Sequence, residues 1–307
     1  MRWGMFIVGI VAAAQGWATD ITFLATSDSQ CGVPERDARN QAAIREMNEM
    51  LHRRWPAKFG AEPVGRPRGV VMLGDLVEHG KQEQGWQRFV ADFGLDGTEG
   101  LLKFPVFEGW GNHDGETGPV RIRERNEARL KKKLISKVSD NGLHYSWDWD
   151  GVHFVQLNLY PGNHAKPPND PQWSLSFLKT DLAETVGRSG RPVVLLHHYD
   201  LQNFKWWTRA EMEAYHEAIW GYNIVLICHG HSGLGVYTWN DYDVINTGQT
   251  ENGFFVVRIT DQQLRVAYRG KHEDGWRWHL MQERKLRRGL SAETVWLDVI
   301  ALPRKCL

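Results

Sequence analysis

The feature that most constrains the fold is a set of short apolar runs, each ending in glycine or in a side chain that binds metals. The run VVML at 70–73 stops at Gly74 and Asp75, and a second run ends at 112–114, which reads Asn-His-Asp. Short apolar runs bounded in this way are typical of buried strands. Helix-period segments separate them, and this alternation predicts a layered α/β fold.

Helices are expected wherever apolar residues recur every three or four positions. In the first of these segments, Ala42, Ile44, Met47 and Leu51 follow this spacing, which indicates one buried helical face. The predicted helices span 35–55, 81–93, 120–138, 171–187 and 208–220.

Strands are expected in the middle and in the last third of the chain. From Leu143 onward the pattern alternates around Asp150-Gly151, a two-residue turn that requires positive φ and predicts a β-hairpin. Further strands are predicted within 235–271, and no element is assigned to the tail at 285–307.

The N-terminus has the composition of a signal peptide. Arg2 precedes a short apolar stretch, and Gly16 and Ala18 are small residues at a cleavage position. We expect 1–18 to be removed, the protein to be secreted or periplasmic, and 19–307 to form one domain; a buried N-terminal helix is the alternative. No later segment approaches 18 uninterrupted apolar residues, so no integral membrane segment is expected.

The overall charge argues against a polyanionic partner. Lys and Arg together number 37, as do Asp and Glu, so the formal net charge is zero. Proteins that bind nucleic acid depend on neutralising the phosphate backbone. No nucleic-acid partner is therefore expected, and the oligomeric state is left open.

Five predicted strand ends carry side chains of the kind that bind metals. In an α/β sheet such ends lie along one edge, where loops can present side chains to a common site. Carboxylate, amide and imidazole groups bind hard or borderline divalent ions, and a carboxylate can bridge two of them. The candidate ligands are Asp28, Gln30, Asp75, Asn112, His197, His229 and His231.

In order and residue type, these blocks resemble the calcineurin-like metallophosphoesterase superfamily. Its motifs run Asp-x-His, Gly-Asp, Gly-Asn-His-Asp or Glu, His, and Gly-His-x-His, and the resemblance spans about 21–231. It implies a four-layer α/β/β/α sandwich of two mixed sheets. It also implies two divalent metal ions, with manganese, iron, zinc and magnesium as candidates.

The resemblance assigns a role to each ligand. Asp75 would bridge the two ions, and Asp28 and His231 would hold the first. The second ion would be held by Asn112, His197 and His229.

The resemblance also implies the reaction. A metal-bound hydroxide would attack phosphorus, and His113, oriented by Asp114, would protonate the leaving group. His198 follows the expected ligand His197 and should point to the opposite side of an extended strand.

The sequence departs from the superfamily pattern at two positions. Gln30 stands where histidine is usual, and it could bind metal through its amide oxygen, hold a water, or leave the first site weak. Cys228 stands where glycine precedes His229. Cys31 and Cys228 adjoin ligand positions, so they could form a disulfide or remain two buried thiols.

The function that follows is hydrolysis of a small phosphoester, a diester in preference to a monoester. Aromatic side chains beyond the ligands could hold substituents on both sides of phosphorus, or could simply cap the core. The alternatives are a secreted binding protein without turnover and a nuclease of the same superfamily. The candidate substrate-binding residues are Tyr160, Tyr199, Trp206 and Trp207.

Overall fold

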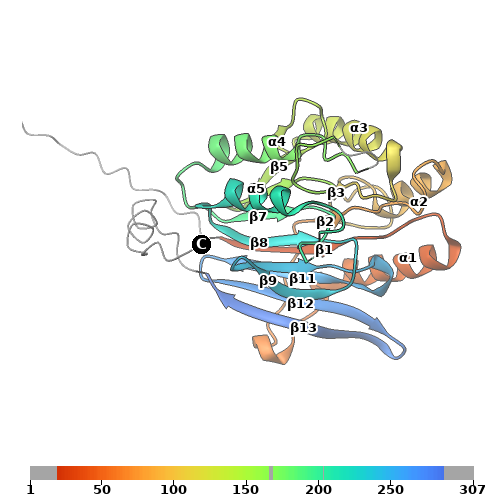
Figure 1. Ribbon diagram of the computed structural model, residues 1–307. Coiled ribbons are helices and arrows are strands. Elements are labelled where there is room, and N and C mark those ends of the chain that lie inside the picture. The colour runs from red at the N-terminus through yellow and green to blue at the C-terminus, as the bar shows by residue number, and fades with distance from the viewer. Residues whose placement is uncertain (1–18, 166–168, 203, 287–307) are drawn as a thin grey trace, which may run out of the picture.

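The computed structural model describes residues 19–165, 169–202 and 204–286. Two mixed β-sheets face each other, and helices cover their outer sides (Figure 1). This confirms the four-layer α/β/β/α arrangement. The predicted signal peptide at 1–18 and the residues at 287–307, which include Cys306, lie outside the described part of the chain.

The first sheet has the strand order β13-β12-β11-β1-β2-β3. Strands β1, β2 and β3 are parallel to one another, whereas β11, β12 and β13 form an antiparallel extension. Its strands are β1 (Asp20–Thr26), β2 (Val70–Leu73), β3 (Val106–Gly109), β11 (Gly253–Thr260), β12 (Gln263–His272) and β13 (Gly275–Lys285).

The second sheet has the strand order β4-β5-β6-β7-β8-β10-β9. Strands β6, β7 and β8 are parallel. The predicted hairpin is confirmed as β5–β6, where Asp150 and Gly151 have φ of 45° and 87°. The strands are β4 (Lys137–Val138), β5 (Tyr145–Trp149), β6 (Val152–Gln156), β7 (Val193–Leu196), β8 (Ile224–His229), β9 (Gly235–Trp239) and β10 (Tyr242–Asn246).

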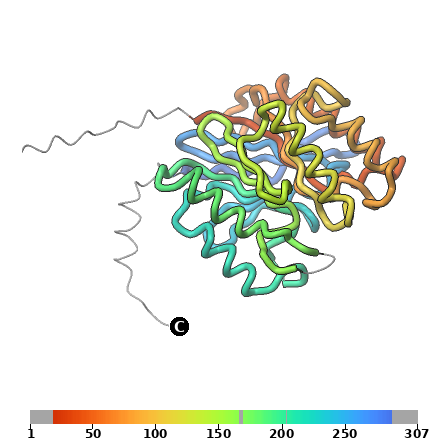
Figure 2. Tube along the Cα trace, turned by 90° about the horizontal axis from the view of Figure 1, so that it is seen from above, coloured from red at the N-terminus to blue at the C-terminus, as the bar shows by residue number. Residues whose placement is uncertain are grey.

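The helices form two groups: α1 to α3 gather on one side of the molecule and α4 with α5 on another (Figure 2). Helix α5 begins with a capping box between Thr208 and Glu211. No helix in the described ranges is both long and apolar enough to cross a bilayer. The helices are α1 (Pro34–Asn48), α2 (Glu83–Phe93), α3 (Gly118–Lys131), α4 (Ser174–Asp181) and α5 (Arg209–Ile219), with single turns η1 (Glu49–His52), η2 (Ala57–Phe59), η3 (Gly115–Thr117), η4 (Leu182–Val186) and η5 (Thr250–Asn252).

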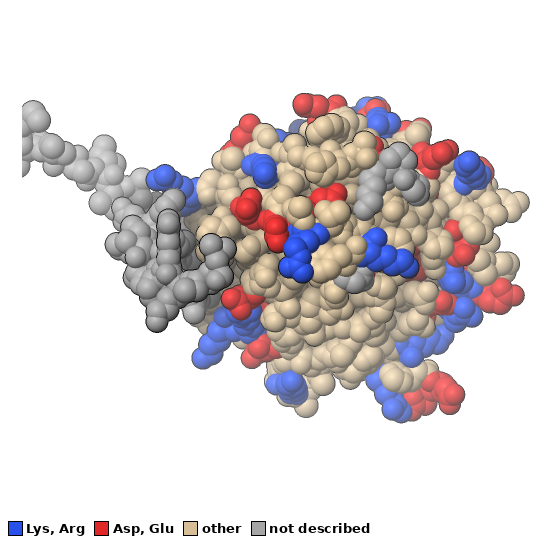
Figure 3. All heavy atoms as spheres, in the orientation of Figure 1, with Lys and Arg blue, Asp and Glu red and all other residues tan. Residues whose placement is uncertain are grey.

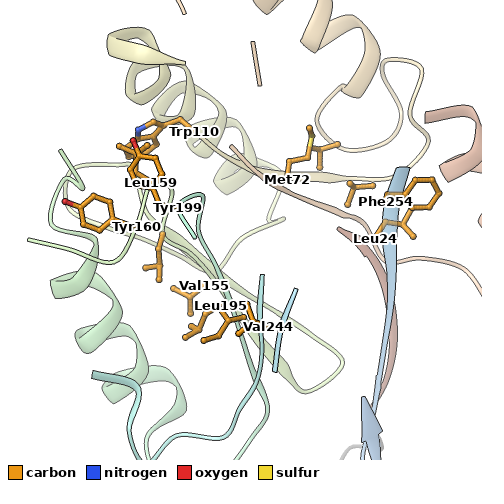
Figure 4. Close-up of a cluster of buried hydrophobic side chains, with 14 of the residues drawn as sticks. Leu24, Met72, Trp110, Val155, Leu159, Tyr160, Leu195, Tyr199, Val244 and Phe254 are labelled. Carbon is orange, nitrogen blue, oxygen red and sulfur yellow. The ribbon is translucent and has the colours of Figure 1, made fainter. Parts of the chain in front are cut away.

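The buried strands divide their side chains between two apolar layers. Successive side chains of a strand point to opposite faces, so in β7 Val194 and Leu196 join the cluster between the sheets, whereas Leu195 joins the other cluster. Figure 4 shows part of that other cluster, in which Leu195 lies beside Val155 and Val244 of the same sheet. This alternation decides which residues after each strand face the space between the sheets.

Two elements differ from the sequence predictions. The helix predicted over 120–138 ends at Lys131, because Lys133 adopts a positive φ of 57° and the chain then turns into the short edge strand β4 at 137–138. Strand β13 had not been predicted, although its Asp274-Gly275 turn followed by Trp276 and Trp278 at alternate positions is a hairpin pattern.

An ionic cluster ties α3 to the sheet. The Glu108 carboxylate of β3 is fully buried and accepts hydrogen bonds from Arg125 and Arg129. Burial opposes ionisation of Glu108, but the two guanidinium groups outweigh it and hold its pKa below the ordinary value. The Tyr145 hydroxyl donates to the Glu108 carbonyl at 2.9 Å, which links the second sheet to the same point.

A buried histidine forms a second charged cluster inside the hairpin sheet. His153 Nδ1 lies 2.7 Å from Asp148 Oδ1, and its Nε2 lies 2.7 Å from Asp181 Oδ2. Arg191 also contacts Asp148, and Lys137 Nζ lies 3.7 Å from Asp181. Burial lowers the pKa of His153, but the two carboxylates outweigh burial and raise it above its ordinary value.

Candidate metal centre

The candidate site lies where the carboxyl ends of the parallel strands of both sheets meet. Asp28 follows β1 and Asp75 follows β2 in one sheet, while His198 follows β7 and His231 follows β8 in the other. Asp75, His198 and His231 each place a ligand atom within 4.8 Å of the others. The predicted convergence of strand ends from both sheets is therefore present in the structure.

The geometric centre of the cluster is one nitrogen, His198 Nε2. It lies 3.1 Å from Asn112 Oδ1, 3.2 Å from His231 Nδ1 and 3.4 Å from Asp75 Oδ1. The other ring nitrogen, Nδ1, donates to the Leu73 carbonyl at 2.6 Å and so carries a proton. In the neutral ring, Nε2 then presents a lone pair toward two acceptor oxygens and toward the Nδ1 atom of His231.

This donor set fits a divalent cation. One proton on Nε2 cannot point at all three neighbouring atoms at once, whereas a cation could be shared by all four atoms. Two imidazoles, a carboxylate and an amide oxygen suit borderline ions such as zinc, iron or manganese. The hydrogen bond from His198 Nδ1 to a carbonyl is the usual support for a metal-binding histidine.

Burial affects the two buried acids of the cluster differently, because His198 compensates Asp75 more than it compensates Asp28. Burial, together with the nearby Asp75 carboxylate, raises the pKa of Asp28 to about 6, although His198 opposes the rise. Burial also disfavours the charged form of Asp75, but His198 outweighs it and keeps its pKa below the ordinary value. Burial would lower the pKa of His198, yet Asp75 raises it to about 9.

Tight backbone packing holds these groups together. A side-chain carbon on Gly111 would lie 2.2 Å from Asp75 Oδ1, and one on Gly74 would lie 2.7 Å from His198 Nδ1. Only glycine permits such close approach. Asp28 and Asp75 themselves adopt positive φ values of 51° and 52°, a strained conformation that is common at functional sites.

The histidine after β7 that faces the site is His198 rather than His197. Residues 194 and 196 face the space between the sheets, so alternation places His198 there and His197 on the helix side. His197 is fully buried, packs against Trp207 and Tyr215, and has no hydrogen-bond partner on either ring nitrogen within the described residues. Both faces of β7 are apolar, so the sequence offered no signal for choosing between the two histidines.

His229 is also turned away from the cluster. Its Nε2 lies 2.6 Å from the Tyr237 hydroxyl and its Nδ1 lies 3.0 Å from the Gly230 carbonyl. Its ring stacks on His197 at 6.0 Å, and burial lowers its pKa to about 4. The second set of ligands, predicted as Asn112, His197 and His229, is therefore not assembled around one point.

His113 lies beside the cluster, but its orienting partner differs from the expectation. His113 Nδ1 lies 2.9 Å from the Glu78 carbonyl, and its backbone amide donates to Asp75 Oδ1 at 2.9 Å. The Asp114 carboxylate instead accepts from the amides of Leu76 and Gly111, which fixes the loop that carries Asp75. Because a carbonyl only accepts, His113 Nδ1 is protonated and Nε2 is free to exchange a proton with a substrate.

Gln30 and the two described cysteines also have defined positions. The backbone amide of Gln30 donates to the backbone carbonyl of Asp75 at 2.9 Å, so the backbone of Gln30 is tied to the site. Cys31 and Cys228 are free buried thiols, not a disulfide. They lie in different apolar clusters, and burial raises the pKa of both.

Only part of the predicted aromatic rim lies at the site. Trp206 and Tyr199 meet the His231 ring edge-on, at 4.3 and 4.9 Å, and stack on each other at 5.1 Å. Tyr160, Tyr199 and Trp207 are all fully buried, and Trp206 is the partly exposed member of the four. Figure 4 shows Tyr160 within the apolar core, and its hydroxyl donates to Glu211, which is the core-capping alternative for this residue.

Comparisons with known proteins agree with this geometry. The sequence profile described as calcineurin-like phosphoesterase matches residues 21–234. No curated protein gives a significant match. Among solved structures, GAP50, titled the anchor in the inner membrane complex of Plasmodium, has a TM-score of 0.56 at 12% identity and covers 93% of this chain and 96% of its own.

Two further structures are similar at lower scores. TT1561 of Thermus thermophilus has 13% identity and a TM-score of 0.46, covering 88% of this chain and all of its own. A 5'-nucleotidase from Candida albicans has 10% identity and a TM-score of 0.44, covering 86% of this chain and 54% of its own. At such identities the match to GAP50 shows the fold alone. The profile match, which covers more than half of the sequence, shows that this chain belongs to the calcineurin-like phosphoesterase family.

Proposed function

We propose that this protein is an exported, metal-dependent hydrolase of small phosphoesters that favours diesters over monoesters. The observation that carries the proposal is the convergence of Asp75, Asn112 and His231 on His198 Nε2. A divalent ion bound there would act as a Lewis acid toward phosphoryl oxygens. Two ions, as the family resemblance implies, are part of the proposal.

The protein's own contribution includes a proton donor beside the cluster. His113 is half-buried, and its Nδ1 is held by the Glu78 carbonyl. This hydrogen bond leaves Nε2 as the atom that can give a proton to a leaving oxygen. Imidazole suits this role because its ordinary pKa lies close to neutrality.

The preference for diesters is supported by the surroundings of His231. The stacked pair of Tyr199 and Trp206 contacts its ring, and a cavity opens beside it. The partly exposed Trp206 and the cavity could each contact one substituent on a phosphorus atom at the cluster. On the face drawn in Figure 3, basic and acidic side chains are interspersed, which favours a small substrate over a polyanion.

The test is hydrolysis of matched esters by protein treated with chelator and then supplied with single metal ions. We expect no hydrolysis without metal, restored hydrolysis with manganese or zinc, and a higher kcat/KM for bis(p-nitrophenyl) phosphate than for p-nitrophenyl phosphate. Trp206→Ala should lower diester turnover selectively. Trp173→Ala is the matched control, because Trp173 is 62% exposed and lines a different cavity.

Export is proposed from the sequence at 1–18. The prediction is that protein recovered outside the cytoplasm begins at residue 19, which N-terminal sequencing measures. A mature chain that retains Met1 would contradict it.

A second candidate function is a binding protein that keeps the fold without turnover. His197 and His229 are both turned away from the cluster, and Gln30 replaces a usual histidine ligand, which favours this candidate. Metal binding of normal affinity, combined with no hydrolysis of either ester under any metal, would support it over the hydrolase.

A further inference from the structure

A cavity of about 380 Å³ opens directly beside the cluster of candidate metal ligands. Asp28 and His231 line it on the cluster side, and Tyr268 of β12 also lines it. One water occupies about 30 Å³ in the liquid. The cavity therefore has room for an organic group as large as a sugar, attached to a phosphoryl group at the cluster.

The lining of the cavity is mixed, partly polar and partly apolar, and carries little charge. Besides Asp28 and His231, its polar side chains are Ser232, Gln249 and Asn252 together with Tyr268, and no Lys or Arg is among the lining residues. A second phosphate or a carboxylate placed there would lack a cationic partner, which is costly. Amides and hydroxyls can each donate and accept, so they match the hydroxyl groups of a neutral substituent.

Tyr268 is the strongest indication of a ligand. The residue is 1% exposed, and its hydroxyl has no hydrogen-bond partner within the described residues. The edges of Phe255 and His279 fix its ring at 5.1 and 4.9 Å. A side-chain carbon on Gly253 would lie 2.8 Å from the hydroxyl, so glycine there leaves room for it. A buried hydroxyl without a partner lowers stability, and a ligand hydroxyl could supply the missing partner.

We propose that this cavity binds a neutral polyhydroxyl substituent of the phosphoester, a sugar or a comparable polyol, and that Tyr268 helps to select it through its hydroxyl. The inference rests on the proposed phosphoester hydrolysis and adds the chemical class of the substituent. It makes Tyr268 a specificity residue at a distance from the reacting phosphorus.

The experiment compares the binding of two probes that differ only in their hydroxyl groups and ring oxygen. Glucose 6-phosphate and cyclohexylmethyl phosphate share a six-membered ring and one methylene before the phosphate. Dissociation constants are measured by calorimetry with Zn²⁺ present, in protein carrying His113→Asn so that turnover does not interfere. The variant Tyr268→Phe is added to this background.

The matched control is Tyr215→Phe. Tyr215 is also fully buried, and its hydroxyl has no partner in the described part of the chain, but it does not line the cavity. We expect the background protein to bind glucose 6-phosphate more tightly, and Tyr268→Phe to weaken that binding by about 3- to 10-fold, the worth of one neutral hydrogen bond. Binding of cyclohexylmethyl phosphate should not weaken, and Tyr215→Phe should change neither value.

The proposal is overturned if the background protein binds the two probes equally or binds neither, or if Tyr268→Phe keeps the full preference. Hydrolysis is measured separately in chains that retain His113. A protein that shows the preference but hydrolyses no ester would refute the proposed hydrolysis and leave the cavity assignment standing.

Discussion

The assignment of His198 rather than His197 as the metal-facing residue leads to a sharp prediction for two adjacent histidines. Replacing His198 by Leu removes the nitrogen on which Asp75 and the other ligand atoms converge. Loss of a group that merely supports a metal ligand costs about 10- to 100-fold in affinity. We therefore expect His198→Leu to lower metal affinity by about 100-fold or more, which is about 2.7 kcal/mol or more.

The same substitution at His197 should behave differently. His197 has two buried ring nitrogens with no hydrogen-bond partner among the described residues, and each such nitrogen costs about 1–3 kcal/mol when unpaired. Leucine removes both nitrogens within the same apolar surroundings. We expect His197→Leu to change metal affinity by less than about threefold, since no ligand atom is lost, and to leave the free energy of unfolding equal or higher.

The assay is competition for Zn²⁺ with a chromophoric chelator, alongside urea unfolding of each metal-free variant. Unfolding separates loss of a ligand from loss of the fold. Equal losses of metal affinity in the two variants, or a larger loss at His197, would refute the orientation argument.

Two further predictions concern the charged clusters away from the metal centre. Glu108→Gln leaves Arg129 buried without its carboxylate partner, so urea unfolding should show a loss of about 3–5 kcal/mol; unchanged stability would contradict this. His153 has a raised pKa when folded, so its contribution to stability is complete below its unfolded value of about 6.5 and is lost as pH rises through the folded pKa. The difference in unfolding free energy between the parent and His153→Gln should therefore shrink as pH increases. A difference that grows with pH would contradict a raised pKa of His153 in the folded protein.

The general position of the site could be predicted because it depends on strand ends. Apolar runs that stop at Asp75 or at Asn112 identify buried strands and the edge where their side chains meet. The left-handed Asp150-Gly151 turn also predicted the hairpin correctly. These features are local, so a single sequence contains them.

The orientation of individual side chains could not be predicted in the same way. Alternation along β7 indicates that His197 and His198 point to opposite sides of their sheet. Only the packing of this sheet against the other sheet decides which of the two sides faces the site. The aromatic residues posed a similar problem, because size and apolarity are equal in a core residue such as Trp207 and a rim residue such as Trp206. Tyr237, the partner of His229, gave no sequence signal at all.

The most direct test of the central claim is Asp75→Asn, with metal content and diester hydrolysis measured on the same preparation. Asparagine keeps the shape and the oxygen that accepts the His113 amide, but it removes the carboxylate charge from the cluster. The structure predicts that bound metal falls well below that of the parent and that hydrolysis of bis(p-nitrophenyl) phosphate is lost, while cooperative unfolding is retained. A variant that keeps both its metal and its hydrolysis would contradict the account of this cluster as the metal-dependent active site.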